Sequence, residues 1–271
     1  MKTGRIRIGA LMLSLVLSAL AAEPDEALLR DATRYGSTPE KRARKEKARA
    51  ELEGRGADGL RLVMRYVHLE NVGVQGLAFE MVGKLDGREA APVLAEFLRS
   101  EEALTRQLAA WFLGFCDTPE YADDVARLLA DEKARGAAMR TLGKWKVRAS
   151  VPGILPFAGD EKEPRRVAAI NALRDIGDPR SIPVLLGALD DPYFTVREAA
   201  ARALASLGRP AEKALLRALP GAGAPARRHI IRTLGARRSL RAAGALRRLL
   251  KDSDPFIRSD AAEALARIRR R

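Results

Sequence analysis

One helix-ending pattern recurs along this chain at almost constant spacing. An apolar residue closes each copy, and a small or apolar residue stands four positions before it. Successive closing residues are 29 to 31 positions apart: Val82, Leu113, Leu142, Leu173, Leu204, Leu234 and Leu265. A fixed period of this size indicates a stack of two-helix repeats, because one helix hairpin cannot bury its apolar face without a neighbour.

The copy at residues 178–208, DPRSIPVLLGALDDPYFTVREAAARALASLG, shows how each repeat is built. Asp178 and Pro179 form a helix-start signal, and apolar residues follow at helical spacing. The segment 190–192, Asp-Asp-Pro, ends that helix because proline cannot continue it. A second helix then runs to Gly208, a residue typical of helix ends. Each repeat is therefore predicted to be two antiparallel helices joined by a turn.

These residues resemble HEAT-type repeats, particularly the short bacterial kind also found in phycobilin lyases. The resemblance is strong at 178–208 and 239–271, and weaker at 56–86, where Gln75 takes the place of an arginine. It implies a right-handed α-solenoid whose second helices line a concave groove in which ligands bind. It implies no activity, because this fold serves many purposes. The expected repeats are 56–86, 87–117, 118–146, 147–177, 178–208, 209–238 and 239–271.

Two further positions recur in the second helix of each repeat. Four before the closing residue stands a small residue that lets neighbouring helices approach closely, at Ala78, Ala109, Ala138, Ala169, Ala200 and Ala261. Seven before it stands an arginine next to the Asp-rich turn, at Arg106, Arg135, Arg166, Arg197, Arg227 and Arg258. We expect these arginines to form a structural ladder that binds turn carboxylates and carbonyl groups, rather than a functional site.

The N-terminal residues 1–21 match a secretory signal. Basic Lys2, Arg5 and Arg7 precede an apolar stretch that is too short for a comfortable membrane span, and a small-x-small sequence follows. We therefore expect an exported protein, periplasmic or extracellular, although retention of the segment as an anchor stays open. Residues 22–55 are predicted to form a charged helical capping unit, with a disordered basic linker as the alternative.

The sequence offers little for catalysis or metal binding. Its two histidines, His68 and His229, stand five repeats apart, and its one cysteine, Cys116, has no second thiol to pair with. Zinc and iron sites of the usual kind therefore lack ligands, and no phosphate-binding loop or nucleophile motif is present. We expect no cofactor and no metal, and a non-enzymatic protein. A chromophore-lyase-like enzyme or chaperone remains an alternative that rests on repeat similarity alone.

Positive charge is concentrated at the C-terminal end. The whole chain has a formal charge of +14, and residues 209–271 carry 17 basic and only 5 acidic side chains. The basic C-terminal patch is expected to comprise Arg237, Arg238, Arg241, Arg247, Arg248, Arg269, Arg270 and Arg271. An electrostatic binder of an anionic polymer, membrane surface or nucleic acid is the alternative function that this patch indicates. Nucleic acid is the least favoured of these partners because the chain is expected to be exported.

The repeat register also places a row of side chains on the second helices. If those helices line the groove, residues near the position two before each closing residue face a ligand: Trp111, Arg140, Asn171, Arg202, Arg228 and Arg232. A tryptophan beside arginines is typical of binding surfaces. The main prediction is therefore a scaffold that holds an acidic protein or peptide partner in its groove, against the alternative of an ordinary solvated face. Tyr193, Phe194 and Trp145 are expected to fill the core between repeats.

Overall fold

A computed structural model describes residues 24–36, 38–69 and 71–269. The expected signal, residues 1–21, and the terminal Arg270 and Arg271 lie outside these ranges. Throughout the described residues the regular secondary structure is helical and no strand occurs, which confirms the predicted all-α fold. The chain divides into two compact units, an N-terminal unit of residues 1–124 and a C-terminal unit of residues 125–271.

The N-terminal unit begins with two helices, α2 (Pro24–Thr33) and α3 (Pro39–Gly54). Thr38 caps α3 by accepting a hydrogen bond from the main-chain N–H of Lys41 at 3.4 Å. Two helix pairs follow: α4 (Ala57–Arg65) with α5 (Val72–Lys84), and α6 (Gly87–Phe97) with α7 (Ala103–Leu113). Short 3-10 turns lie at η1 (Val67–Leu69) and η2 (Pro119–Tyr121).

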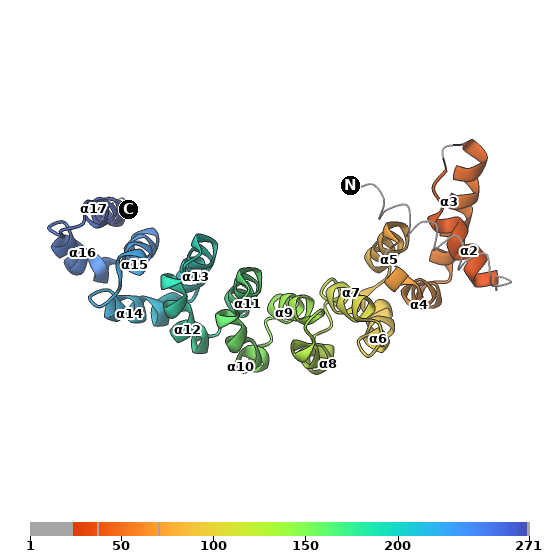
Figure 1. The fold of residues 1–271 in the computed structure, drawn as a ribbon, viewed down its shortest axis with the longest axis horizontal. Coiled ribbons are helices and arrows are strands. Elements are labelled where there is room, and N and C mark those ends of the chain that lie inside the picture. The colour runs from red at the N-terminus through yellow and green to blue at the C-terminus, as the bar shows by residue number, and fades with distance from the viewer. Residues whose placement is uncertain (1–23, 37, 70, 270–271) are drawn as a thin grey trace. The chain divides into compact units, whose positions relative to one another are not determined.

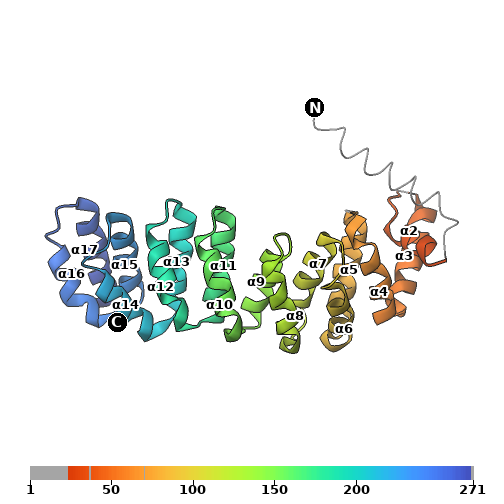
Figure 2. The ribbon, with the colours of Figure 1, turned by 60° about the horizontal axis from the view of Figure 1, so that its bottom comes forward.

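The C-terminal unit continues the same pairing, beginning in α8 (Ala122–Arg127), which crosses the unit boundary. Its first helices are α8 with η3 (Leu128–Ala130), α10 (Val151–Ile154) with η5 (Leu155–Gly159), α12 (Ile182–Gly187) with η7 (Ala188–Asp190), α14 (Gly208–Ala218) and α16 (Ala243–Leu249). Its second helices are α9 (Arg135–Lys144), α11 (Glu163–Ile176), α13 (Phe194–Ser206), α15 (Ala224–Ala236) and α17 (Pro255–Arg269). Further 3-10 turns, η4 (Arg148–Ser150), η6 (Pro179–Ser181) and η8 (Leu240–Ala242), lead into α10, α12 and α16. From α11 to α17 the second helices lie side by side in one row and the first helices form another (Figures 1 and 2).

The positions that define the repeat form the core. Every closing residue is buried, as are the alanines four positions before them. A glycine one position after the closing residue allows close contact between second helices at two junctions. A Cβ added to Gly235 in α15 would lie 2.7 Å from Cα of Ala264 in α17, and one added to Gly143 in α9 would lie 3.1 Å from Cα of Ala172 in α11. At these two junctions the main chains of neighbouring second helices are in contact.

Most second helices of the C-terminal unit end at a left-handed residue four positions after the closing residue. Glycine occupies this position at Gly177 (φ 70°) and Gly208 (φ 70°), whereas Lys146 (φ 55°) and Arg238 (φ 51°) adopt it despite carrying a Cβ. Glycine reaches this conformation without the steric cost that other residues have. The helix-ending pattern in the sequence thus reflects one repeated backbone geometry.

Two details differ from the sequence-based expectations. Tyr193 and Phe194 were expected to fill the core, but they are 51% and 60% exposed because they stand at the turn that begins α13. Trp145 is half-buried at the C-terminal cap of α9.

Replacing Gly235 by alanine tests the close contact between α15 and α17. The new methyl group would lie 2.6 Å from Cβ of Ala264, so the two helices must separate. We expect a loss of about 2 kcal/mol in the free energy of unfolding. The matched control is Gly136→Ala, which meets no atom within 4 Å and stands in the first turn of α9, so it should change the free energy of unfolding by less than about 0.5 kcal/mol. Thermal unfolding followed by circular dichroism measures both; equal melting temperatures would contradict the close contact.

Candidate functional site

The ladder arginines bind the turn that precedes each second helix. Each guanidinium donates to main-chain carbonyl groups five to seven residues before it, which the end of the first helix leaves without helical partners. The pairs are Arg106 with Ser100 and Glu101, Arg135 with Leu129 and Ala130, Arg166 with Asp160 and Glu161, Arg197 with Asp191 and Pro192, Arg227 with Pro220, and Arg258 with Asp252 and Ser253. These arginines therefore tie each second helix to the turn before it.

Two ladder arginines also reach the turn of the following repeat. Nε of Arg166 lies 2.7 Å from a carboxylate oxygen of Asp191, with the two side chains 9% and 10% exposed, and the pair raises the pKa of Arg166. Arg227 makes the equivalent but longer contact to Asp252 at 3.5 Å. Asp191 and Asp252 each stand thirteen positions before the closing residue of their own repeat. In the repeat that closes at Leu234, the same position is Gly221. Arg197 consequently has no such carboxylate to meet.

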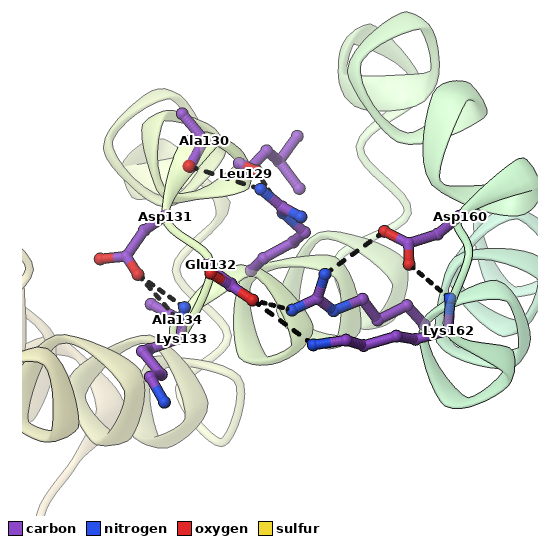
Figure 3. Close-up of polar contacts among 10 residues, drawn as sticks. Leu129, Ala130, Asp131, Glu132, Lys133, Ala134, Asp160 and Lys162 are labelled. Atoms are coloured by element: carbon purple, nitrogen blue, oxygen red, sulfur yellow. Dashed lines mark hydrogen bonds and ion pairs between the residues drawn. The ribbon is translucent and has the colours of Figure 1, made fainter.

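Figure 3 shows the polar contacts that join the turns of two neighbouring repeats. Glu132 accepts a hydrogen bond from Arg165, and Nζ of Lys162 lies 3.7 Å from the same carboxylate. Asp160 accepts from the main-chain N–H of Lys162 at 2.8 Å, a bond that lowers the pKa of Asp160. Asp131 accepts from two main-chain N–H groups of its own turn. The carboxylates at this edge thus serve to fix the turns.

A hollow of about 420 Å³ opens on the second helices α13, α15 and α17. Its lining residues are Glu198, Ala201, Arg202, Ala205, His229, Arg232, Thr233, Ala236, Asp260, Glu263, Ala264 and Arg267. Small alanine side chains leave the space, and charged side chains surround it. We call this hollow the second-helix groove. It includes Arg202 and Arg232 from the predicted row.

Several groove charges already have partners inside the protein. Asp260, which is 6% exposed, binds Nε of Arg228 at 2.7 Å and Nε of Arg232 at 2.9 Å. Arg267 pairs with Glu263 at 2.7 Å. Arg228 and Arg232, both predicted to meet an acidic ligand, are therefore partly neutralised by one buried carboxylate. The sequence analysis missed Asp260 because its partners stand 28 and 32 residues away.

Arg202 and Arg140 differ from these arginines. Arg202 is exposed, and within the described residues its only hydrogen bond is from Nε to the main-chain carbonyl of Glu198 at 3.4 Å. Arg140 is exposed on α9 and makes no hydrogen bond or ion pair with the described residues. Asn171 accepts a hydrogen bond from Arg174 at 3.0 Å. Two guanidinium groups of the predicted row thus remain available on the second helices of this unit.

His229 lies at the wall of the groove and is 7% exposed. Burial lowers its pKa, nearby Glu198 acts in the opposite direction, and Arg197, Arg232 and Arg228 lower it further. The ring centroid of Phe194 lies 6.2 Å from that of His229. His229 is therefore a neutral wall residue at neutral pH.

The N-terminal unit carries an aromatic cluster on its second helices. Trp111, the predicted apolar anchor, is half-buried and stacks nearly parallel on Phe79, with ring centroids 5.7 Å apart. Phe115 meets both rings edge-on at 5.4 and 5.3 Å. Phe79 and Phe115 are 44% and 48% exposed. Sequence analysis missed these two, because the position of Phe79 holds alanine, methionine or isoleucine in the other repeats, so an apolar residue there gives no distinct signal.

The basic C-terminal patch is only partly as predicted. Arg237 is tied to the protein, because its guanidinium donates to the main-chain carbonyl of Ala205. Exposed side chains of the patch are those of Arg238, Arg241, Arg247, Arg248 and Arg269. The remaining two, Arg270 and Arg271, fall outside the described residues.

Metal-binding clusters and membrane-spanning helices are both absent from the described ranges. No group of three or more His, Cys, Asp or Glu side chains could hold a metal ion there. None of the helices placed by the structure is long and apolar enough to cross a bilayer. Cys116 is buried, and its thiol lies 3.9 Å from the carbonyl oxygen of Phe112.

Comparison with known sequences identifies the repeats. The sequence model for HEAT repeats matches residues 126–205 and 211–271, which together make up just over half of the chain. A curated relative, the uncharacterized phycocyanin operon protein Y of Pseudanabaena tenuis (strain PCC 7409), is 32% identical over 136 residues. That alignment covers 46% of this chain and 32% of the relative, so the chain spans about a third of the relative's length.

Comparison with solved structures supports the same fold. An engineered protein superposes with a TM-score of 0.52 at 17% identity, covering 93% of this chain and 76% of the engineered one. The YibA protein of Escherichia coli superposes with a TM-score of 0.50 at 19% identity, covering 87% and 88% of the two chains. At these identities the likeness concerns the fold alone.

Substituting Arg166 tests the link between neighbouring repeats. Arg166→Met leaves Asp191 as an uncompensated, nearly buried carboxylate, and should lower the free energy of unfolding by about 3 kcal/mol. Arg227→Met is the matched control at the same ladder position, where the ion pair is longer and more exposed, and should cost about 1 kcal/mol. Urea unfolding compares the two. Equal losses would show that the carboxylate link contributes little beyond the carbonyl contacts.

The lowered pKa of His229 predicts a pH dependence of stability. Because the folded protein binds this proton more weakly than the unfolded chain, stability should be unaffected above the ordinary histidine pKa of about 6.5 and fall as the pH drops below it. Unfolding free energies near pH 8 and near pH 5 should therefore differ more for the wild type than for His229→Gln. The same pH dependence in both proteins would contradict burial of a neutral His229.

Proposed function

The chain belongs to the HEAT-repeat family, and on that premise we propose that it is a non-catalytic scaffold whose second-helix groove holds a protein or peptide partner. HEAT-type arrays present their second helices as a continuous surface, and this groove, about 420 Å³ in volume, opens on three of them. The partner segment carries an acidic side chain beside small apolar ones, because the groove combines an alanine floor with an exposed arginine.

The observation that carries this proposal is the state of Arg202. Among the arginines that line the groove, Arg232 and Arg267 meet carboxylates of the protein, whereas Arg202 meets only a carbonyl group. An exposed guanidinium without a carboxylate binds an incoming carboxylate in a bidentate manner. Arg140, on α9 of the same unit, offers a second cation to the partner.

A chromophore-lyase-like activity is the second candidate, favoured by the relative from a phycocyanin operon. That relative is itself uncharacterized, and the aligned part is a minority of its length. No residue of the groove has a partner arrangement typical of a general acid, general base or nucleophile. Binding without chemistry is therefore the proposal that we argue.

We also propose that the chain acts outside the cytoplasm. The support is the pattern of residues 1–21, in which basic residues precede an apolar stretch and a small-x-small sequence. An exported scaffold would meet its partner in the cell envelope or the medium, which fixes where a test should look.

Affinity capture with the tagged full chain, from envelope and cytoplasmic fractions of the native cells, tests both proposals. We expect one partner from the envelope fraction, retained at moderate salt and bound at least about tenfold more weakly by Arg140→Glu/Arg202→Glu. The control Arg209→Glu/Arg217→Glu makes the same charge change on the first helix α14 and should bind normally.

The outcomes separate the proposals. A partner that both double variants retain equally would remove the groove as the binding site. A specific partner present only in the cytoplasmic fraction would contradict export while leaving the scaffold function in place. Conversion of an added bilin by the purified protein would establish the lyase alternative.

A further inference from the structure

The first helices of the last two repeats carry a dense set of cations. On α14, Arg209, Lys213 and Arg217 are exposed and stand at four-residue spacing, so they share one face of the helix. Around α16, the exposed basic residues are Arg238, Arg241, Arg247, Arg248 and Lys251. We call these residues, with Leu240 and Leu250, the outer basic face.

Acidic side chains near this face are held by other groups. Glu212 is the one carboxylate within α14, and it accepts a hydrogen bond from the hydroxyl of Ser239 at the start of η8. Asp252, which follows Lys251, accepts from the main-chain N–H of Asp254 and pairs with Arg227. Within the described residues, the cations of the outer basic face have no ion pair. The excess positive charge of residues 209–271 is therefore displayed here rather than in the groove.

Two large apolar side chains stand exposed among these cations. Leu240, between Arg238 and Arg241, is 68% exposed, and Leu250, next to Lys251, is 41% exposed. Both belong to the stretch 238–251, which contains five basic residues and no acidic one. Leu240 begins η8 and Leu250 caps α16, so apolar surface stands before and after the cations of α16 in the chain.

We propose that the outer basic face binds the surface of a bilayer that contains anionic phospholipid. Arginine and lysine side chains are attracted to anionic headgroups, and the leucines enter the boundary between headgroups and acyl chains. Duplex nucleic acid would use the cations alone, because phosphate contacts give no role to exposed leucines. Aromatic rings that could stack on single-stranded bases are absent from the outer basic face.

Binding to a surface through the first helices leaves the opposite, second-helix side of the C-terminal unit open. Arg140 and Arg202 stand on the second helices α9 and α13, whereas Arg241, Arg247 and Arg248 stand on or beside the first helix α16. A membrane contact at the outer basic face and a partner in the groove are therefore compatible. The two activities are separable by substitution.

Co-sedimentation of the purified full chain with lipid vesicles tests the proposal. We expect binding to vesicles of phosphatidylcholine mixed with phosphatidylglycerol, little charge-dependent binding to phosphatidylcholine alone, and weakening as salt rises above about 0.1 M. Arg247→Glu/Arg248→Glu should lower the partition coefficient roughly twentyfold or more. The matched control Arg140→Glu/Arg202→Glu changes the charge equally and should bind as the wild type does.

A second variant separates membrane binding from simple charge attraction. Leu240→Ser/Leu250→Ser keeps every charge and should lower the partition coefficient about tenfold, because the apolar contact is lost. Any binding caused by the apolar stretch of residues 8–20 is common to all variants and persists on neutral vesicles, so the partition coefficient on phosphatidylcholine alone is subtracted before the ratios are compared. Circular dichroism spectra establish that each variant is folded.

Three results would overturn the proposal. The first is equal weakening of vesicle binding by the outer and the groove double variants. The second is a leucine variant that binds vesicles with unchanged affinity. The third is tight, salt-sensitive binding to duplex DNA by a protein that leaves vesicles unbound, which would assign the outer basic face to nucleic acid.

Discussion

The contact between each ladder arginine and the turn before its helix determines how a repeat is put together. A first helix ends with carbonyl groups that have no helical partner, and the guanidinium of the next helix satisfies them. Because the arginine belongs to the second helix, the contact also sets where that helix begins relative to the turn. The buried alanines then contact the neighbouring helix at a fixed position along its axis. Close main-chain contacts such as that of Gly235 with Ala264 depend on this placement.

The repeated part of the fold could be predicted from the sequence because its signals are local and recur. The closing residues, the alanines and the arginines each occupy one position in a two-helix unit, and that position decides their burial. Contacts that occur only once in the array could not be predicted. The pairing of Arg228 and Arg232 with Asp260 joins residues of different repeats, and no spacing within one repeat marks it. The register places Tyr193 and Phe194 at a turn, but it does not show whether that turn folds over the core, and both side chains are largely exposed.

The C-terminal unit separates two kinds of surface by how its charges are compensated. In the groove, carboxylates of the protein pair with Arg232 and Arg267 and leave Arg202 without one, which is the arrangement that the proposed single acidic contact needs. On the outer basic face, cations stand without ion pairs, which is the arrangement that the proposed contact with an extended negative surface needs. Net charge alone could not distinguish these two arrangements, because it counts both kinds of arginine alike. The distinction arises from which helix of the pair carries each residue.

The ion pair of Arg166 with Asp191 joins equivalent elements of consecutive repeats, each repeat supplying one half of the contact. A duplicated repeat of this kind would therefore contain both an arginine that can pair with the following repeat and an aspartate that can pair with the preceding one. A repeat inserted at this junction would keep both ion pairs only if it carried the arginine and the aspartate at these two positions. Where Gly221 takes the place of the aspartate, Arg197 holds its own turn through carbonyl groups and makes no ion pair with the described residues of the next repeat.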